Sequence, residues 1–164
     1  MRSGSRYAYT PAHLAADRGD LDILQWLCSQ NRFFFFHKNG EGRTIAHLAA
    51  ATQYPQGDNH PNVLKWILDQ NVDIADTDNA GATVGHLAAA NDNIRRSSAV
   101  HLDVLRCIFD RKDGAQLINV PDNNGKTPFH HAVGRDPNPS YCGIHCASHV
   151  IIPFTETYLI VKLK

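Results

Sequence analysis

One seven-residue phrase occurs four times in the chain and constrains its fold more than any other feature. The copies are TPAHLAA (10–16), TIAHLAA (44–50), TVGHLAA (83–89) and TPFHHAV (127–133). Their first threonines are 34, 39 and 44 residues apart. A phrase that recurs at intervals of roughly 20–50 residues is typical of a protein built from stacked supersecondary repeats. We therefore expect a repeat architecture.

A second, apolar segment follows three of the four phrases. It reads DLDILQWLC from residue 20, HPNVLKWIL from residue 60 and HLDVLRCIF from residue 101. Its apolar residues recur one, three and four positions apart, which predicts a helix buried along one side. The distance from the threonine to this segment grows from 10 to 16 to 18 residues, whereas the distance onward to the next threonine stays between 23 and 26. Most of the variation therefore lies in loops, within the stretches QYPQGDN and NDNIRRSSAV.

The residues around each phrase predict the remaining elements of a repeat. Alanine-rich AHLAA favours a short helix whose thin face lets a neighbour approach closely, and a threonine before it suits the helix N-cap. Turn sequences, namely NGEGR, DNAGA and DNNGK, precede three of the threonines. One repeat is thus expected to be a turn, a short helix, a loop and a longer helix.

This pattern resembles the ankyrin repeat, which has a period of about 33 residues and the signature T-P-L-H-x-A. The resemblance implies an all-α solenoid of stacked antiparallel helix pairs with projecting hairpin loops. It covers residues 7–135, although the first repeat lacks its preceding hairpin and the last lacks a recognisable second helix. The expected divisions are a flexible segment 1–6, repeats 7–37, 38–76 and 77–120, a partial repeat 121–135 and a non-repeat tail 136–164.

The resemblance implies structural roles for the repeated threonines and histidines. The threonines cap the short helices, and the histidines hydrogen-bond the backbone and join neighbouring hairpins. These residues are Thr10, His13, Thr44, His47, Thr83, His86, Thr127 and His130. Because a position repeated in every copy serves the repeated fold, we assign none of these residues to a metal or catalytic site.

The resemblance also implies non-catalytic protein–protein binding, with the partner on a concave surface formed by the hairpin tips and the ends of the short helices. The expected tip contacts are Gly40, Glu41, Asn79, Ala80, Asn123 and Asn124. The expected helix-end contacts are Asp17, Arg18, Ala51, Thr52, Ala90, Asn91, Gly134 and Arg135. Their mixed chemistry argues against a strongly charged partner.

Four consecutive phenylalanines, Phe33 to Phe36, interrupt a polar stretch before the second threonine. The resemblance implies a buried side chain nine residues before each threonine, at Phe35, Ile74 and Ile118. An extended segment would then place Phe33 inward with Phe35, and Phe34 and Phe36 outward. Outward rings would form an exposed patch that docks a partner. Local packing of all four rings and an aggregation-prone segment are the alternatives.

The composition excludes several classes of function. Sixteen Lys+Arg balance sixteen Asp+Glu, so no net field attracts nucleic acid or an anionic membrane. The N-terminal sequence MRSGSRYAYT lacks the apolar region of a signal peptide, and the phenylalanine run falls far short of the ~20 apolar residues of a membrane span. We expect a soluble, intracellular protein, cytoplasmic or also nuclear. Because the sequence holds no P-loop, GxSxG or HExxH motif, we expect no enzyme activity and no cofactor.

The C-terminal tail supports a rival, metal-binding function. Cys142, His145, Cys146 and His149 would line one face of a helix, and all are zinc-ligand types. One straight helix cannot surround an ion tetrahedrally, however, so a second element would be required. The segment HVIIPFTETYLIVKLK is rich in β-branched and aromatic residues and predicts extended or disordered chain. A truncated regulatory fragment of a larger ankyrin protein is the other alternative, and an uncapped end could drive self-association.

Two sites of modification and the cysteines complete the predictions. Two arginines precede Ser97 and Ser98 in IRRSSAV, a pattern that suits a basophilic kinase acting on Ser98. Asn119 in LINVPD resembles the asparagine that some ankyrin repeats offer to a hydroxylase. Cys28 and Cys107 fall at helical core positions, which favours a reducing compartment.

Overall fold

The computed structural model describes residues 9–51, 59–90, 98–112, 114–133, 149–154 and 157–162. The chain divides into two compact units, Met1–Ala132 and Val133–Lys164. The loop insertions at 52–58 and 91–97 lie outside the described residues.

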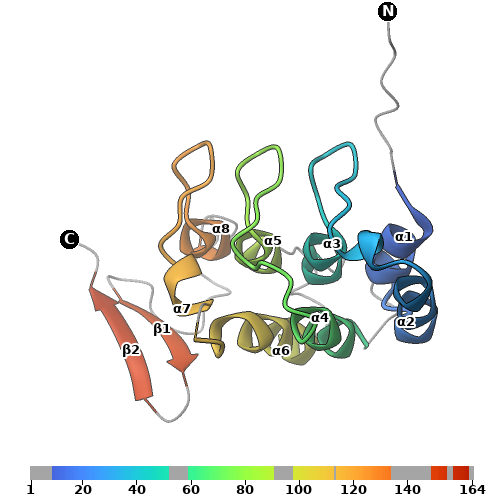
Figure 1. Cartoon of the computed structure of the whole chain (residues 1–164). Coiled ribbons are helices and arrows are strands. Elements are labelled where there is room, and N and C mark those ends of the chain that lie inside the picture. The colour runs from blue at the N-terminus through green and yellow to red at the C-terminus, as the bar shows by residue number, and fades with distance from the viewer. Residues whose placement is uncertain are drawn as a thin grey trace, which may run out of the picture. The chain divides into compact units, whose positions relative to one another are not determined.

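The first unit is a stack of helix pairs. Four short helices carry the repeated phrase: α1 (Pro11–Arg18), α3 (Ile45–Ala51), α5 (Val84–Ala89) and α8 (Pro128–Val133). Three longer helices carry the apolar segment: α2 (Leu21–Gln30), α4 (His60–Leu68) and α6 (Ser98–Phe109). The short helices form one row and the longer helices a second, while hairpin loops project from the side of the short helices (Figure 1). The expected ankyrin-type solenoid is confirmed.

Caps and composition explain the short helices. Thr10 caps α1, Pro11 occupies its first turn, and Gly19 ends it in the left-handed region at φ 78°. In α3 every residue from Ile45 to Ala51 is buried. Because alanine side chains are thin, α1 and α5 can both pack closely against α3. Ala51, an expected partner contact, is therefore covered by its own stack.

The longer helices bury an apolar stripe, with one exception. In α4, Val63, Leu64, Ile67 and Leu68 are fully buried. In α2, by contrast, two residues of the stripe are exposed, namely Ile23 and Trp26. They face outward because no helix pair among the described residues precedes α1 and α2.

Two short elements were not expected from the sequence. A single 3-10 turn, η1 (Arg32–Phe35), follows α2, and a four-residue helix, α7 (Gly114–Leu117), follows α6. Both lie between a longer helix and the next hairpin. Ile118, the expected buried residue of the third repeat, is only half-buried directly after α7, whereas Ile74 is buried as expected.

The second unit contains two strands, so the all-helical class holds for the repeats and not for the tail. Strands β1 (His149–Phe154) and β2 (Thr157–Lys162) pair antiparallel, with Ile151 opposite Ile160. Within the described residues, no helix is long and apolar enough to cross a bilayer.

Candidate protein-interaction surface

The three hairpins share one turn built on an Asn or Asp side chain. In the second hairpin, Oδ1 of Asp78 accepts hydrogen bonds from the backbone N–H groups of Ala80 and Ala82, at 2.8 and 2.9 Å. Gly81 closes the turn at φ 75°, a left-handed conformation that glycine adopts without a steric penalty. Asn39 and Asp122 make the same pair of bonds in the other two hairpins. Hydrogen bonds within each turn therefore hold the conformation of each hairpin tip.

The hairpins are also hydrogen-bonded to one another. The backbone N–H of Asn79 donates to the Glu41 carbonyl at 2.9 Å, and its side-chain Nδ2 donates to the Gly40 carbonyl at 3.1 Å. Asn123 repeats both bonds one hairpin further on, to the carbonyls of Ala80 and Asn79. This ladder, defined by Asn79 and Asn123, holds the three tips at fixed spacing.

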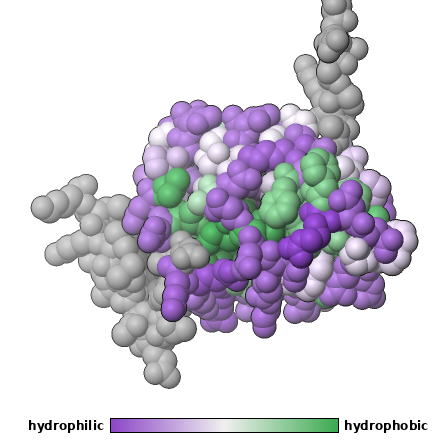
Figure 2. Space-filling model, in the orientation of Figure 1, coloured by the Kyte–Doolittle hydropathy of each residue, from purple (hydrophilic) through white to green (hydrophobic). Residues whose placement is uncertain are grey.

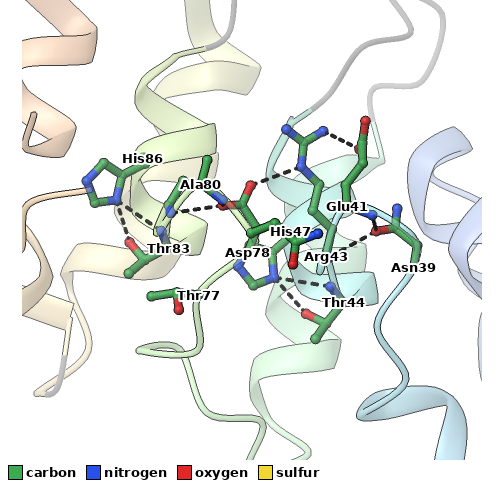
Figure 3. A network of polar contacts seen from close by, with 12 residues as sticks. Asn39, Glu41, Arg43, Thr44, His47, Thr77, Asp78, Ala80, Thr83 and His86 are labelled. Atoms are coloured by element: carbon green, nitrogen blue, oxygen red, sulfur yellow. Dashed lines mark hydrogen bonds and ion pairs between the residues drawn. The ribbon is translucent and has the colours of Figure 1, made fainter. Parts of the chain in front are cut away.

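Ion pairs reinforce the first two hairpins. Nε of Arg43 donates to Oδ2 of the buried Asp78 at 3.2 Å, and a second guanidinium nitrogen lies 3.0 Å from Glu41. Figure 3 shows the Arg43 side chain extended between these two carboxylates. Just before the turns of the same two hairpins, Nζ of Lys38 lies 2.6 Å from Oδ1 of Asp76. The negative charge of Glu41 at the tip is thus balanced by a neighbour.

The third hairpin satisfies its buried carboxylate differently. Ala82 occupies the position of Arg43, so no guanidinium is present there, and Oδ2 of Asp122 instead accepts from His131 at 2.9 Å. Burial alone would raise the pKa of Asp122, but hydrogen bonds from His131 and from the backbone of Lys126 and Asn124 outweigh it and lower the pKa to about 2. Asp122 is therefore a carboxylate throughout the physiological pH range.

Every repeat contains the same threonine–histidine contact. In the first repeat, the Thr10 backbone N–H donates to Nδ1 of His13 at 3.1 Å, and the Thr10 hydroxyl lies 2.8 Å from the same nitrogen. The equivalent contacts occur at Thr44, Thr83 and Thr127, two of which Figure 3 shows. Since Nδ1 accepts, the proton of the neutral ring is on Nε2.

The second ring nitrogen joins one repeat to the next. Nε2 of His13 lies 3.1 Å from the Arg43 carbonyl, and Nε2 of His86 lies 3.0 Å from the Lys126 carbonyl. Nε2 of His47 faces the Ala82 carbonyl without a hydrogen bond of normal geometry. These histidines are buried, so they act as structural links between hairpins.

Burial lowers the pKa of His13, His47 and His86 below the usual 6.5. Nearby acids, chiefly Asp78, oppose the shift at His47. A positive charge on these rings would also place a proton on Nδ1, against the threonine N–H that donates to it. The folded repeats therefore favour the neutral imidazole.

We expect the stability of the protein to decrease as the pH falls through about 6.5. Unfolded histidines take up protons near that pH, whereas the buried ones resist, so each can add up to about 1.4 kcal/mol per pH unit to the slope. Above pH 6.5 both states are neutral and the slope from these groups vanishes. Asp122 does not contribute in this window, because its stabilisation is lost only below its unfolded pKa of 3.8. Urea unfolding between about pH 7.5 and 5.5 measures the effect.

His47→Gln is the matched variant for this prediction. Glutamine can still accept the Thr44 N–H but does not titrate, so the variant should be less stable at neutral pH and less sensitive to acidification. Equal slopes for the variant and the wild type would show that His47 protonation does not limit stability.

All six predicted tip residues are exposed, namely Gly40, Glu41, Asn79, Ala80, Asn123 and Asn124. At the helix ends Arg18 is exposed, Asp17 and Ala90 are half-buried, and burial raises the pKa of Asp17. Thr52, Asn91, Gly134 and Arg135 lie outside the described residues. Hydrophilic tips border a band of hydrophobic surface between the hairpins and the longer helices on the face shown in Figure 2.

The phenylalanine segment is helical, not extended, and this overturns the predicted alternation. Phe35 is 3% exposed and packs against Trp66, with ring centroids 5.5 Å apart and the rings tilted by 39°. Phe33, predicted inward, is 58% exposed, as is Phe36 at 57%, and Phe34 is half-buried. A 3-10 helix has three residues per turn, so side chains three apart share a face. The exposed pair is therefore Phe33 and Phe36.

The metal and modification predictions fall mostly on residues that are not described. Cys142, His145 and Cys146 lie outside the described residues, and His149 begins strand β1, so the proposed helix face does not continue through it. The described part of the chain holds no cluster of metal-ligating side chains. Ser98 begins α6, and Asn119 is exposed after α7. Both remain predicted modification sites.

The two described cysteines are free thiols. Burial raises the pKa of Cys28 to about 11 and also raises the pKa of Cys107. Because the thiolate is the reactive form, the raised pKa values make both thiols less reactive than a free cysteine; Cys28 is buried and Cys107 is half-buried.

Sequence reasoning missed the buried residue that organises each hairpin. Asn39, Asp78 and Asp122 each precede a glycine by three positions, in NGEG, DNAG and DNNG. An Asn or Asp that opens a turn and accepts from the backbone two residues later is a recognisable turn signal. The turns were predicted, but these side chains were not singled out.

Comparison with known proteins identifies the family. A family model described as "Ankyrin repeats (3 copies)" matches residues 2–78. Residues 2–78 are therefore ankyrin repeats. Beyond residue 78, the assignment of the ankyrin repeats rests on the structure, where α5 and α8 carry the same threonine–histidine contacts.

Inversin from the dog (Canis lupus familiaris) is 29% identical over 155 residues, which is 76% of this chain and 14% of inversin. The chain thus corresponds to a small part of that relative. Ankyrin repeats are in general protein-interaction modules and not a catalytic fold, which agrees with the expected class of function.

Proposed function

We propose that this ankyrin-repeat chain is an adaptor or scaffold that binds a partner protein on its hairpin tips and the adjoining ends of its short helices. The observation that supports this most is the combination of exposure and rigidity at the tips. All six tip residues are exposed, yet the Asn79 and Asn123 ladder fixes the loops that carry them. A surface ordered before binding loses little conformational entropy when a partner docks.

The chemistry of this surface favours a partner recognised by hydrogen bonds. The tips offer backbone groups and the side-chain amide of Asn124, whereas the amides of Asn79 and Asn123 already donate within the ladder. The one tip carboxylate, Glu41, is paired with Arg43. Strong electrostatic attraction is therefore not the source of specificity. A polar protein segment of low net charge fits these groups.

Affinity capture from a lysate with an obstructed variant tests the proposal. Ala80→Arg/Asn124→Arg places two large charged side chains on the tips, at positions whose own side chains make no ladder bond. Gln25→Arg/Gln116→Arg adds the same charge at exposed positions of α2 and α7. We expect a defined partner that the wild type and the control retain and the tip variant loses at least about tenfold.

All three baits must give matching far-UV circular dichroism, so that misfolding does not imitate lost binding. A partner retained equally by the tip variant would place the binding site elsewhere on the molecule.

A further inference from the structure

Large hydrophobic side chains are exposed at the α1–α2 end of the stack, whereas their counterparts in the second repeat are buried or half-buried. In the first repeat, Leu14, Ile23 and Trp26 are 46%, 53% and 63% exposed. At the same positions of the second repeat, Leu48 is 1% and Val63 0% exposed, and Trp66 is half-buried. The residue type is apolar at each position in both repeats. The difference therefore comes from what packs against the position.

Contacts inside the stack show which way the tryptophan position points. Trp66 packs against Phe35 of the preceding repeat. At the same position of the third repeat, Sγ of Cys107 lies 3.8 Å from the carbonyl of Pro61, again in the preceding repeat. Trp26 thus points away from the second repeat, and α1 is the first helix of the described residues. We call Leu14, Ile23 and Trp26 the N-terminal face.

Two opposite charges border the N-terminal face. Arg18 lies four residues after Leu14 on α1, and Asp22 lies four residues before Trp26 on α2, so each shares a helix side with an apolar member of the face. Both are exposed, and neither belongs to the ion pairs found among the described residues. A two-fold interface requires a patch that is complementary to itself. An apolar centre with one cation and one anion meets that requirement.

We propose that the N-terminal face binds the same face of a second copy of this chain, forming a two-fold dimer. Trp26 and Ile23 supply the apolar centre, as their counterparts do between repeats, and Arg18 of each copy pairs with Asp22 of the other. A chain with equal numbers of acidic and basic residues carries no net repulsion against its copy. The interface shares Arg18 with the expected helix-end contacts but includes none of the six tip residues, so the dimer would leave the hairpin tips of both copies available to partners.

Sedimentation velocity on the full chain over a range of concentrations tests the dimer. We expect the wild type to shift from monomer to dimer as its concentration rises. Trp26→Lys should weaken association at least about thirtyfold, as expected for a tryptophan at the centre of an interface. Phe36→Lys, which changes an equally exposed aromatic outside the face, should associate as the wild type does. Circular dichroism confirms that both variants remain folded.

Charge reversal distinguishes this arrangement from general stickiness. Arg18→Glu and Asp22→Arg should each weaken the dimer, and the double variant should restore it, because each pair then forms with exchanged signs. A wild type that stays monomeric at every concentration would overturn the proposal. So would a dimer that survives Trp26→Lys, or one that only Phe36→Lys removes.

Discussion

Phe35→Ala should destabilise the protein by about 3–5 kcal/mol, whereas Phe33→Ala and Phe36→Ala should each change its stability by less than about 0.5 kcal/mol. Phe35 is buried between α2 and the second repeat, where its ring contacts Trp66 and the Arg32 guanidinium. Removing it leaves a cavity that the alanine-rich helices cannot collapse to fill. The exposed Phe33 and Phe36 leave no such cavity.

Urea unfolding of the three variants, followed by far-UV circular dichroism, measures these differences. The three substitutions are chemically identical and lie within four residues, so they control for one another. Equal losses for all three would mean that the rings pack as one cluster, and a neutral Phe35→Ala would contradict the position of η1.

The phenylalanine segment shows where sequence reasoning failed. The position of Phe35 relative to the threonine correctly predicted its burial. The predicted extended conformation around Phe35 was wrong. The reason lies in the asparagines that follow two of the longer helices, because they adopt different backbone conformations. Asn71 ends the helical turn after α4 in the left-handed region at φ 59°. Asn31 is extended, and its side chain accepts from the Phe33 N–H at 2.9 Å, which starts a new 3-10 turn. Because both residues are asparagine, residue type alone does not predict which backbone conformation each adopts.

Gly81→Ala should be the more damaging of two alanine substitutions in the hairpins, by at least about 2 kcal/mol relative to Gly125→Ala. Both glycines have positive φ, 75° and 73°, so both variants incur the cost of a left-handed alanine, about 1–3 kcal/mol. A Cβ on Gly81 would in addition lie 2.8 Å from the backbone nitrogen of Asn123. The third hairpin would have to shift and would lose its ladder bonds.

Gly125→Ala is the matched control because, in the described structure, no atom lies within 4 Å of the position its Cβ would take. Thermal and urea unfolding of both variants measure the difference. If the two lose equal stability, hairpin stacking contributes little and the cost lies in backbone conformation alone.

Features confined to one repeat could be predicted from the sequence, and contacts between repeats could not. The threonine caps, the short helices and the apolar stripe follow from local composition and period. The pairing of Arg43 with Asp78, by contrast, depends on two hairpins whose spacing only the stack determines. Asp122 has no such partner in the preceding hairpin, where Ala82 occupies the position of Arg43, and its carboxylate accepts from His131 of its own repeat. The exposure of Trp26, at a position that is half-buried in the second and third repeats, likewise depends on what packs against it in the stack.

Hydrogen–deuterium exchange of the chain alone and with its captured partner tests whether the hairpin surface is the binding site. We predict added protection at the hairpin segments 38–43, 77–82 and 121–126, with α2, α4 and α6 unchanged. Protection confined to those longer helices, or to Phe33 and Phe36, with the hairpins unaffected, would contradict the account.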